Sequence, residues 1–583
     1  MKETVVKTEL CVIGGGISGL CAAVAAARRG VKVVLVQDRN VLGGNASSEI
    51  RMWIRGAGLQ FPAYKEGGLI EELALDNMHF NPQMNYSIWD GVLYNKAASE
   101  KNIDLMLGCT CIGAEENNKT ISCIEVWELA SYRKYKIFAD YFADCSGDCI
   151  LSEFTDTLVM SGRESRAKYG EDKTVLSADK MTMGNSCMLQ LKKAHAELLP
   201  HYPFPFERHD AAELCAKRVD LSQVDNTLHN FWWLETGGED DALRNAGEIN
   251  RNLIALNFAV YSEYLRCNEN NKEKWFAEWI GFLAGKRETR RYEGDYVLTQ
   301  GDLENSKEFF DEIAYGGWSM DDHDPRGICA EIPNIHHRLE KPYAIPYRCL
   351  YSKNIKNLFF AGRNISVTHM ALSSTRVMAT CGMLGQAVGT ACALAKKHNV
   401  DPRGVLQYID ELKSNLLNDD CYLLHTERKN MLYRVATESN FFAQKEVLPE
   451  RDFSENCENA VKLGKNERIY FLFEKRYVGA VRLVFDSDLM RKNYKDQAVK
   501  LFPMLCYVSD GESVAQTPPS LVKDYEIEIR KDGKWEKVKI EGNFHRLNII
   551  SIGEEIEGIA FKGIETHGDE NIRLYSVDIL EDE

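Results

Sequence analysis

An unbroken apolar run, Leu10-Cys11-Val12-Ile13, opens the hydrophobic pattern of the chain and is followed at once by glycines. Buried strands of parallel sheets read as continuous apolar runs because both of their faces are covered. Small residues at positions 22–27 then predict a closely packed helix, which Gly30 ends. The apolar residues 31–36 predict a second buried strand. The chain is therefore predicted to begin with a strand, a glycine turn, a helix and another strand.

The glycines between the first strand and the helix have a spacing that is typical of dinucleotide-binding turns. Gly14, Gly16 and Gly19 form G-x-G-x-x-G in the required context. Gly14 permits the tight turn, Gly16 lets the backbone approach a diphosphate, and Gly19 allows close packing of helix and strand. The diphosphate is expected at the helix start, at Ile17 and Ser18, where N–H groups are unpaired. A glycine-rich turn in an unrelated α/β domain is the alternative, which the flanking elements disfavour.

The residues that end the second strand bear on which dinucleotide binds. An acidic residue usually holds the adenosine ribose there, but this chain has Gln37, followed by Asp38 and Arg39. Either the Gln37 amide oxygen or Asp38 is expected to accept from the ribose hydroxyls. A neutral Gln37 followed by Arg39 also leaves NADP open. The glycine pair Gly43-Gly44 favours FAD, because it brings a second stretch of backbone to the cofactor.

Small polar residues after this glycine pair are candidates for contacts to the cofactor. Asn45 and Ser48 can donate hydrogen bonds to it. Ser48 can equally cap a helix that carries Ile50 and Ile54. On that helix Arg51 and Arg55 would lie one turn apart, where a solvated face is favoured over an anion-binding one.

Two later apolar runs also end in small residues. Residues 141–145 lead into Ser146, Gly147 and Asp148, and residues 357–361 lead into Gly362 and Arg363. With the opening fingerprint, these motifs resemble FAD-dependent oxidoreductases of the class with two dinucleotide-binding domains. The first run is similar to the alanine-threonine-glycine-type motif of that class, and the second to its later flavin motif, with Arg363 where aspartate is usual. A subfamily of bacterial FAD-dependent oxidoreductases, distantly akin to fumarate-reductase flavoproteins, gives the best match, over residues 7–400.

The resemblance implies FAD as cofactor and a Rossmann-like α/β domain in two parts, residues 1–160 and 336–400. It also implies that Cys111 lies where the backbone meets the adenine. Residues 161–335 break the nucleotide-fold rhythm and are expected to form an inserted cap or substrate domain. Helical periodicity runs through residues 241–285, with Ile249, Leu253, Leu256 and Val260 on one side.

Two polar segments of the insertion are candidates for substrate binding. Alternation would place Arg287, Thr289 and Arg291 on one strand face, where they could bind a carboxylate or a polyhydroxylated substrate. A solvated face is the alternative. The second segment, residues 316–325, includes Trp318 and the run Asp321-Asp322-His323-Asp324. This run is either a plain turn or, more weakly, a metal site; no metal is expected.

His369 is the best candidate for catalytic proton transfer, because imidazole titrates near neutral pH. A structural, hydrogen-bonded histidine is an equal alternative. Arg376 can bind substrate or a flavin carbonyl, and Arg291 is the third catalytic candidate. The small-residue helix that follows, up to residue 396, is expected to aim its N-terminus at the flavin and to stabilise negative charge on the reduced ring.

The C-terminal third has a different pattern. A helical connector is expected over residues 401–464, and about seven short strand-like runs fill residues 465–583. Asp532-Gly533 predicts a hairpin. Together these strands predict a jelly-roll-like β-sandwich, similar to galactose-binding-like domains. A structural role is favoured over carbohydrate binding.

Composition limits the possible partners. The net charge of −16 argues against nucleic acid, because phosphate binding needs a basic surface. No run is expected to reach the length of a membrane span, and the first strand leaves no room for a secretory signal. The 17 cysteines are scattered, which suits buried thiols in a reducing cytoplasm.

The sequence therefore predicts an FAD enzyme that transfers a hydride between flavin N5 and a small polar substrate. The expected substrate is a sugar or alcohol CH–OH, which includes carbohydrate-related molecules, or an activated C=C. An oligomer is possible. A non-redox, glycan-binding protein on a flavin fold is the alternative from another class. A tRNA-modifying flavoprotein is disfavoured by the acidity.

Overall fold

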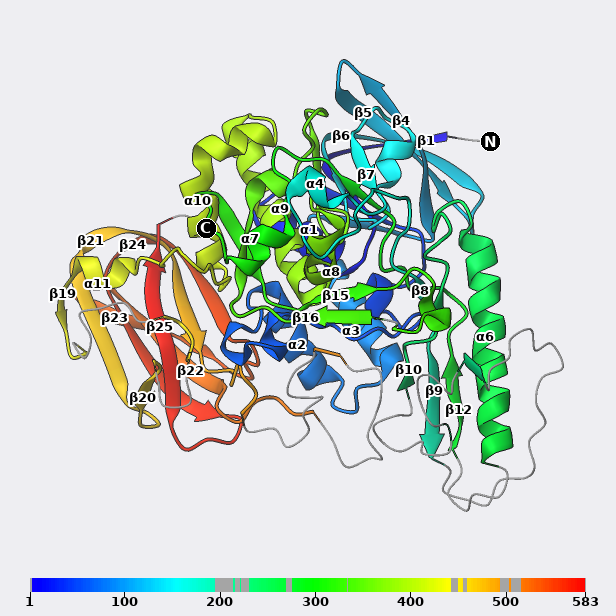
Figure 1. Ribbon diagram of the computed structural model, residues 1–583. Helices are drawn as coiled ribbons and strands as arrows, with labels where there is room; N and C mark the ends of the chain where they lie inside the picture. Colours follow the sequence, from blue (N-terminus) through cyan, green and yellow to red (C-terminus); the bar gives the residue numbers. More distant parts are fainter. Residues whose placement is uncertain are drawn as a thin grey trace.

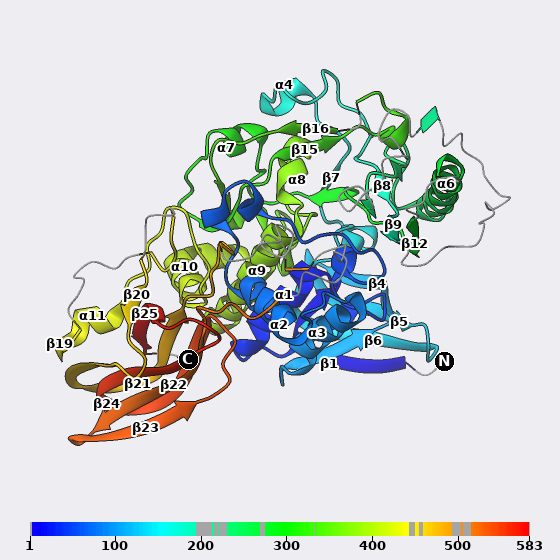
Figure 2. The same cartoon turned by 90° about the horizontal axis from the view of Figure 1, so that it is seen from below.

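The computed structural model describes residues 3–193, 213–214, 221, 230–268, 275–332, 334–441, 449–453, 459–492, 503–504 and 515–581. Three regions are visible in Figure 1. Helices occupy the centre, with the N-terminal strands above them at the upper right. The C-terminal strands lie at the left, and helix α6 (Ala246–Cys267) lies at the right with other strands beside it. The same arrangement is seen from below in Figure 2.

The central sheet confirms the Rossmann-like FAD-binding fold. Its parallel strands have the order β3-β2-β1-β6, and β18 pairs in parallel with the last three residues of β6. The predicted strands at residues 10–13 and 31–36 are the end of β1 and most of β2, and Leu10–Ile13 pair with Val33–Val36. Two antiparallel strands, β4 and β5, lie beside the first half of β6. The bounds are β1 Glu3–Ile13, β2 Val33–Gln37, β3 Ile103–Leu107, β4 Cys109–Asn117, β5 Thr120–Glu128, β6 Arg133–Asp144 and β18 Leu358–Phe360.

Helix α1 (Ile17–Arg28) packs on this sheet, and α9 (Met378–His398) packs closely on α1. Glycines make the approach possible: a Cβ on Gly385 would lie 2.0 Å from the Ser18 carbonyl oxygen, and one on Gly389 would lie 2.2 Å from that of Ala22. Two further helices, α2 (Leu69–Phe80) and α3 (Tyr86–Ala98), cover the same region. The small residues predicted for α1 and α9 therefore allow these two helices to pack closely.

The expectation that no apolar run reaches the length of a membrane span is wrong. Helix α9 is long and apolar enough to cross a membrane by length and composition. Within the protein, however, 89% of its apolar window is buried. Its hydrophobicity is therefore that of a core helix, as its packing on α1 requires.

The insertion is less helical than its periodicity suggests. A helix was expected over residues 241–285, but α6 ends at Cys267 and strand β12 (Trp275–Ile280) follows. Helix α6 and β9, β10 and β12 enclose a small separate core that includes Leu189, Phe231 and Val260. The other elements are β7 Val159–Ser161, α4 Arg166–Tyr169, β8 Asn185–Ser186, β9 Leu189–Lys193, β10 Asn230–Phe231, β11 Glu235–Thr236, β13 Arg290–Tyr292, α7 Gln300–Glu304, β14 Glu312–Gly316, β15 Met320–His323, β16 Asn334–His337, β17 Tyr343–Pro346 and α8 His369–Thr375.

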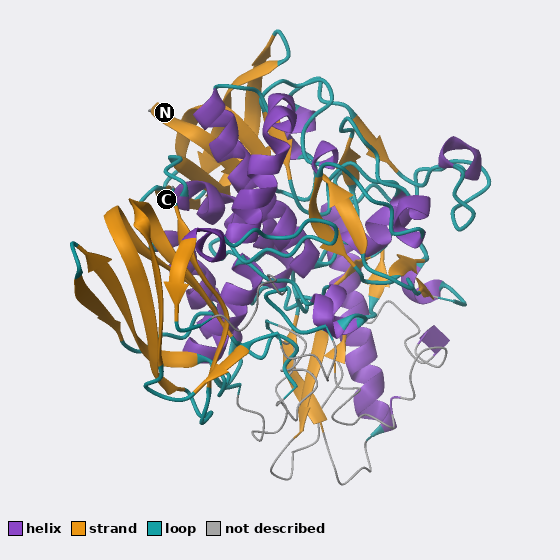
Figure 3. Ribbon diagram, turned by 90° about the vertical axis from the view of Figure 1, so that its left-hand side faces the viewer, coloured by secondary structure: helices purple, strands orange, loops and turns teal. Residues whose placement is uncertain are grey.

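The C-terminal region is antiparallel and rich in β-structure, as expected, and Figure 3 shows its strands on one side of the helical centre. The predicted short runs merge, because β21 (Arg468–Phe485) and β24 (Leu547–Thr566) each span two of them. In the described part of this region, seven strands are hydrogen-bonded in one continuous sheet. Asp532-Gly533 makes the predicted hairpin, with both residues at positive φ. The remaining elements are α10 Ile409–Asn418, α11 Met431–Val435, β19 Ala436–Ser439, β20 Val461–Leu463, β22 Val522–Lys531, β23 Lys534–Ile540 and β25 Ile572–Leu580.

Candidate functional site

A cavity of about 860 Å³ lies where the two predicted cofactor-binding stretches meet. Cavities that hold small molecules and cofactors measure roughly 300–1,000 Å³. Its wall contains residues from both stretches, so segments that are distant in the sequence line the same cavity. The predicted cofactor residues on the wall are Gly14, Gly16, Ile17, Ser18, Gln37, Asp38, Arg39, Gly43, Gly44, Asn45, Cys111, Ser146, Gly147, Asp148, Gly362 and Arg363.

The three fingerprint glycines have different surroundings. Gly14 has φ +98°, and a Cβ there would lie 2.6 Å from the Ser146 backbone. Gly19 is not on the wall; a Cβ there would lie 1.8 Å from the Gly14 carbonyl oxygen. Gly16 is open, because a Cβ would meet only the Gly44 Cα, at 3.9 Å. Gly14 and Gly19 therefore shape the turn, whereas Gly16 leaves the close approach that a diphosphate needs.

Gln37 supports the glycine turn. Its amide oxygen accepts from the Gly15 N–H at 2.7 Å, and its amide nitrogen donates to the Val41 carbonyl at 3.2 Å. The exposed side chain of Asp38 is therefore better placed to accept from a ribose hydroxyl. Arg39 forms an ion pair with Glu49 at 3.1 Å. Because Glu49 and Asp38 both line the cavity, this end repels a ribose phosphate and disfavours NADP.

Buried hydrogen bonds hold the corner after β6. The Asp144 carboxylate accepts from the Ser146 N–H at 2.9 Å, from its hydroxyl at 2.6 Å and from the Tyr292 hydroxyl at 2.5 Å. Burial raises the pKa of Asp144 above its ordinary value, although these bonds oppose the shift. The strand end that abuts the cavity is thus rigidly held.

Arg363 replaces the usual aspartate and has an acidic partner of its own. Its guanidinium donates to Asp148 at 2.8 Å, and the Lys286 ammonium lies 2.6 Å from the other oxygen of that carboxylate. Its buried Nε has no hydrogen-bond partner among the residues that the structure describes. A carboxylate, that of Asp148, therefore lies beside Arg363 on the cavity wall.

The expected helix around Ile50 is absent. Residues 48–56 are irregular, and Arg51 has φ +62°. Ser48 is off the cavity wall, and its N–H donates to Asp90 at 3.0 Å. Arg55 lines the cavity, so the favoured solvated face is wrong for this residue.

Arg55 lies among tryptophans, in a part of the cavity that we call its tryptophan-lined end. Its guanidinium carbon is 4.3 Å from the ring centre of Trp53 and 4.9 Å from that of Trp318. Trp232 and Trp279 also line the cavity. Sequence reasoning missed these rings. Trp318 lay within a polar segment that it flagged, but Trp232 and Trp279 carried no signal.

A chain of alternating charges borders the same end. Arg376 donates to the Asp321 carbonyl at 3.0 Å, and the Asp321 carboxylate lies 3.1 Å from His323 Nε2. His323 Nδ1 lies 3.0 Å from Glu235, which pairs with Arg287 at 2.9 Å. Burial alone would raise the pKa of Asp321, but His323 and Arg376 hold it below the ordinary value. Asp321 is therefore a carboxylate at neutral pH.

Residues 9–416 match the model of the FAD dependent oxidoreductase family. The chain belongs to this family. FAD is therefore its cofactor, and the cavity residues fit it: the open backbone at Gly16 and the start of α1 would hold the diphosphate.

Among solved structures, similar ones include a geranylgeranyl bacteriochlorophyll reductase-like protein from Thermoplasma acidophilum (11% identity, 71% of this chain and 86% of that chain, TM-score 0.31). Others are p-nitrophenol 4-monooxygenase from Pseudomonas putida (11%, 71% and 86%, 0.32) and the flavin-dependent monooxygenase PieE in complex with FAD and substrate (10%, 71% and 64%, 0.30). A comparison with curated proteins finds no match. At these TM-scores the family assignment depends on the family model alone.

Two predicted catalytic residues of this FAD-dependent oxidoreductase are not on the cavity wall. His369 is buried, with Nδ1 2.9 Å from Glu288 and Nε2 3.0 Å from Asp322. Burial opposes its protonation, but the two carboxylates raise the pKa of His369 to about 10. Arg291 is fully buried and pairs with Glu288 and with Glu164. The two carboxylates thus favour the protonated form of His369, which belongs to a buried ionic cluster and does not line the cavity.

The predicted strand face of arginines is divided by the fold. Arg287 lines the cavity, but Arg291 in β13 points into the buried cluster. Thr289 lies between them and donates to the Gly147 carbonyl at 3.2 Å. Only Arg287 of the two arginines can therefore contact a molecule in the cavity.

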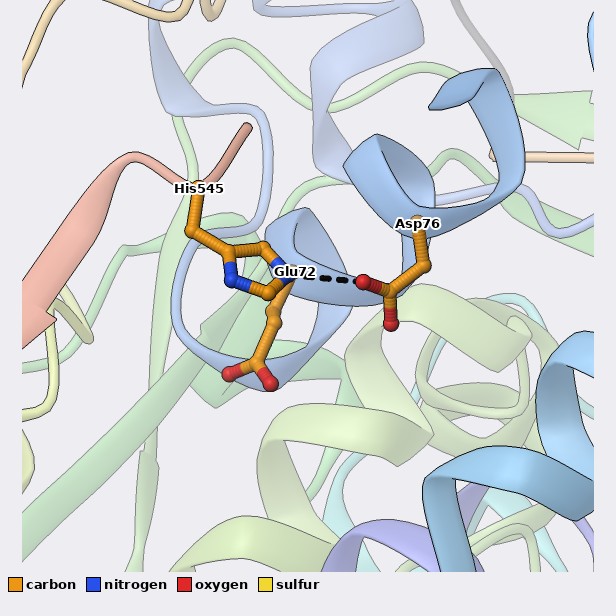
Figure 4. A group of neighbouring side chains, drawn as sticks. All are labelled: Glu72, Asp76 and His545. Carbon is orange, nitrogen blue, oxygen red and sulfur yellow. Dashed lines mark hydrogen bonds and ion pairs between the residues drawn. The ribbon is translucent and has the colours of Figure 1, made fainter. Parts of the chain in front are cut away.

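One group of described side chains has the spacing of metal ligands. Glu72 and Asp76 of α2 and His545 have ligand atoms within 4.8 Å of one another, and His545 bonds to Asp76 (Figure 4). The Lys96 ammonium lies 2.6 Å from Glu72 and 2.5 Å from Asp76, and Arg28 pairs with Glu72. Both carboxylates thus have cationic partners, and we assign no metal to this group.

Proposed function

We propose that the protein transfers a hydride between FAD and a small polar substrate that binds at the tryptophan-lined end of the cavity. The observation that supports this is the continuity of one cavity, from the glycine turn to Trp318 and Arg376. Bound FAD supplies a ring that accepts or delivers a hydride. The cavity offers room for a second molecule beside polar groups that can orient it.

If the hydride passes to the flavin, the substrate is an alcohol or sugar CH–OH. If the hydride passes from the reduced flavin, the substrate is an activated C=C. Oxidation of CH–OH to C=O gives up a hydride from carbon and a proton from oxygen. His323 is the histidine on the cavity wall among the described residues, and it is hydrogen-bonded to Asp321. We assign the proton transfer to this pair rather than to His369. In reduction of C=C the same pair would donate the proton.

Arg376 and the start of α9 complete this end of the site. Val377, Met378 and Cys381 line the cavity, and the Ala379 N–H donates to the Arg55 carbonyl at 2.9 Å. This bond fixes the arginine loop against the helix end. The positive end of α9 would favour negative charge that develops on the reduced ring.

Family membership favours this enzymatic proposal over a non-redox, glycan-binding protein. The division into an FAD-binding part, an insertion, a connector and a β-rich part is kept as a proposal, with a structural role for the last. A cytoplasmic location is also proposed, since the 14 described cysteines are free thiols and 12 of them are buried.

The test is anaerobic reduction of the bound flavin. The FAD-loaded protein is mixed with sugars, hydroxy acids and simple alcohols, and flavin absorbance is followed. In parallel, chemically reduced protein is mixed with enoates. One substrate class should bleach or restore the yellow colour. A loaded protein that reacts with no member of either panel would contradict the proposal.

A further inference from the structure

The tryptophan-lined end of the cavity has an excess of cationic side chains. Arg55, Arg287 and Arg376 line it, together with His323, and Asp321 is the carboxylate on its wall. Glu235 lies behind the wall and pairs with Arg287. This local balance is opposite in sign to the whole chain, whose net charge is −16. An excess of positive charge in a partly desolvated cavity attracts an anion.

Arg376 has hydrogen-bonding capacity that the protein does not use. It lies between α8 and α9, and its side chain is only 14% exposed. One terminal nitrogen donates to the Asp321 carbonyl at 3.0 Å and lies 3.5 Å from its carboxylate. The buried Nε has no partner among the described residues. The described residues therefore use only part of the hydrogen-bonding capacity of the Arg376 guanidinium.

Arg287 is held in a fixed position beside the same space. Its guanidinium donates to the Gly184 carbonyl at 3.0 Å and to the Ser186 hydroxyl at 2.7 Å, and it pairs with Glu235. Because these contacts are buried, the side chain has little freedom to move. A pre-positioned guanidinium loses less entropy when it binds a ligand.

We propose that the substrate carries a carboxylate, which the Arg376 guanidinium binds, with Arg287 adding charge. This inference rests on the proposed function and narrows it to hydroxy acids, sugar acids or enoates. A guanidinium matches a carboxylate because its N–H groups and the two oxygens can form parallel, charge-assisted hydrogen bonds. A neutral polyol offers hydroxyls but carries no negative charge to match the cationic side chains of this wall.

The test measures binding of matched anionic and neutral probes to the oxidised, FAD-loaded protein. The pairs are gluconate and sorbitol, lactate and lactamide, and malonate and malonamide, and the flavin difference spectrum reports binding. At least one carboxylate should bind about tenfold or more tightly than its neutral partner. Equal affinities in every pair would overturn the inference.

Variants identify the residue responsible. Arg376→Gln should weaken binding of the preferred carboxylate by about tenfold to a hundredfold, without changing the affinity of its neutral partner. Arg376→Lys should restore part of the affinity, because lysine keeps the positive charge but cannot form the two parallel hydrogen bonds of a guanidinium. Arg348→Gln is the control, since that arginine pairs with Asp311 outside the cavity. An Arg376→Gln protein with unchanged carboxylate affinity would also overturn the inference.

The two proposals can fail separately. If carboxylates bind through Arg376 but no substrate reduces the flavin, the binding inference stands and the hydride transfer fails. If a neutral sugar or alcohol reduces the flavin as fast as the matched acid, the hydride transfer stands and the carboxylate is wrong.

Discussion

Arg491, from the C-terminal region, donates to both carboxylate oxygens of Glu71 in α2, at 2.7 and 2.9 Å. The Lys65 ammonium lies 2.6 Å from the same carboxylate, and all three side chains are buried. Burial would raise the pKa of Glu71, but Arg491 and Lys65 lower it to about 2. This ion cluster joins the β-rich region to the FAD-binding core.

Loss of Arg491 should destabilise the whole protein. Arg491→Met leaves Glu71 with one fewer buried cationic partner, and breaking such a pair costs about 3–5 kcal/mol. The control is Arg476→Met, which removes a partly exposed pair with Glu581 and should cost at most about 1 kcal/mol. Urea unfolding, followed by flavin and tryptophan fluorescence, measures both. A loss in Arg491→Met no larger than that of the control would mean that the cluster does not join the two regions.

The fingerprint glycines should separate folding from cofactor binding. Gly19→Ala would force a Cβ to 1.8 Å from the Gly14 carbonyl and should lower the stability of the protein even without FAD. Gly16→Val should leave the apo fold intact, because a Cβ there meets only Gly44, but its methyl groups would block the diphosphate. Gly91→Ala in α3 is the control, with nothing within 4 Å of its Cβ. Unfolding midpoints of apo and FAD-loaded proteins, with flavin content, measure the effects; a yellow Gly16→Val protein would refute the diphosphate site.

The local parts of the fold could be predicted from the sequence. Gly14, Gly16 and Gly19 were identifiable because a turn, a helix start and a close contact each impose requirements on neighbouring residues. The hairpin at Asp532 was readable for the same reason. The length of β21 was not, since it depends on strands β24 and β25 from far along the chain.

The substrate end could not be predicted because it depends on how the insertion folds back. Trp279 lies in β12 and Trp53 near the first cofactor helix, and no local pattern shows that they line one cavity. His323 and His369 pose the same difficulty. Both are buried between two carboxylates, but only tertiary structure puts His323 on the wall.

These two histidines form a matched pair for mutagenesis. His323→Gln should keep FAD but slow flavin reduction by substrate, by roughly 10²- to 10⁴-fold, because a proton-transfer group is lost. His369→Gln should leave the rate per folded, flavin-loaded molecule within a few-fold of wild type, because His369 does not line the cavity. Stopped-flow reduction under anaerobic conditions measures both rates. A slow His369→Gln protein and a His323→Gln protein with an unchanged rate would instead assign the proton transfer to His369.

His369 should also make stability depend on pH. Its ordinary pKa is near 6.5, and Glu288 and Asp322 raise it to about 10 in the folded protein. The folded state therefore holds a proton that the unfolded state releases between these values. The contribution of His369 is complete below pH 6.5 and is lost progressively as the pH rises to 10. The free-energy gap between wild type and His369→Gln should be largest near pH 6, at about 3–5 kcal/mol, and narrow toward pH 10. Urea titrations at pH 6, 8 and 10 measure this gap, and a constant gap across the range would show that His369 is not held as a cation.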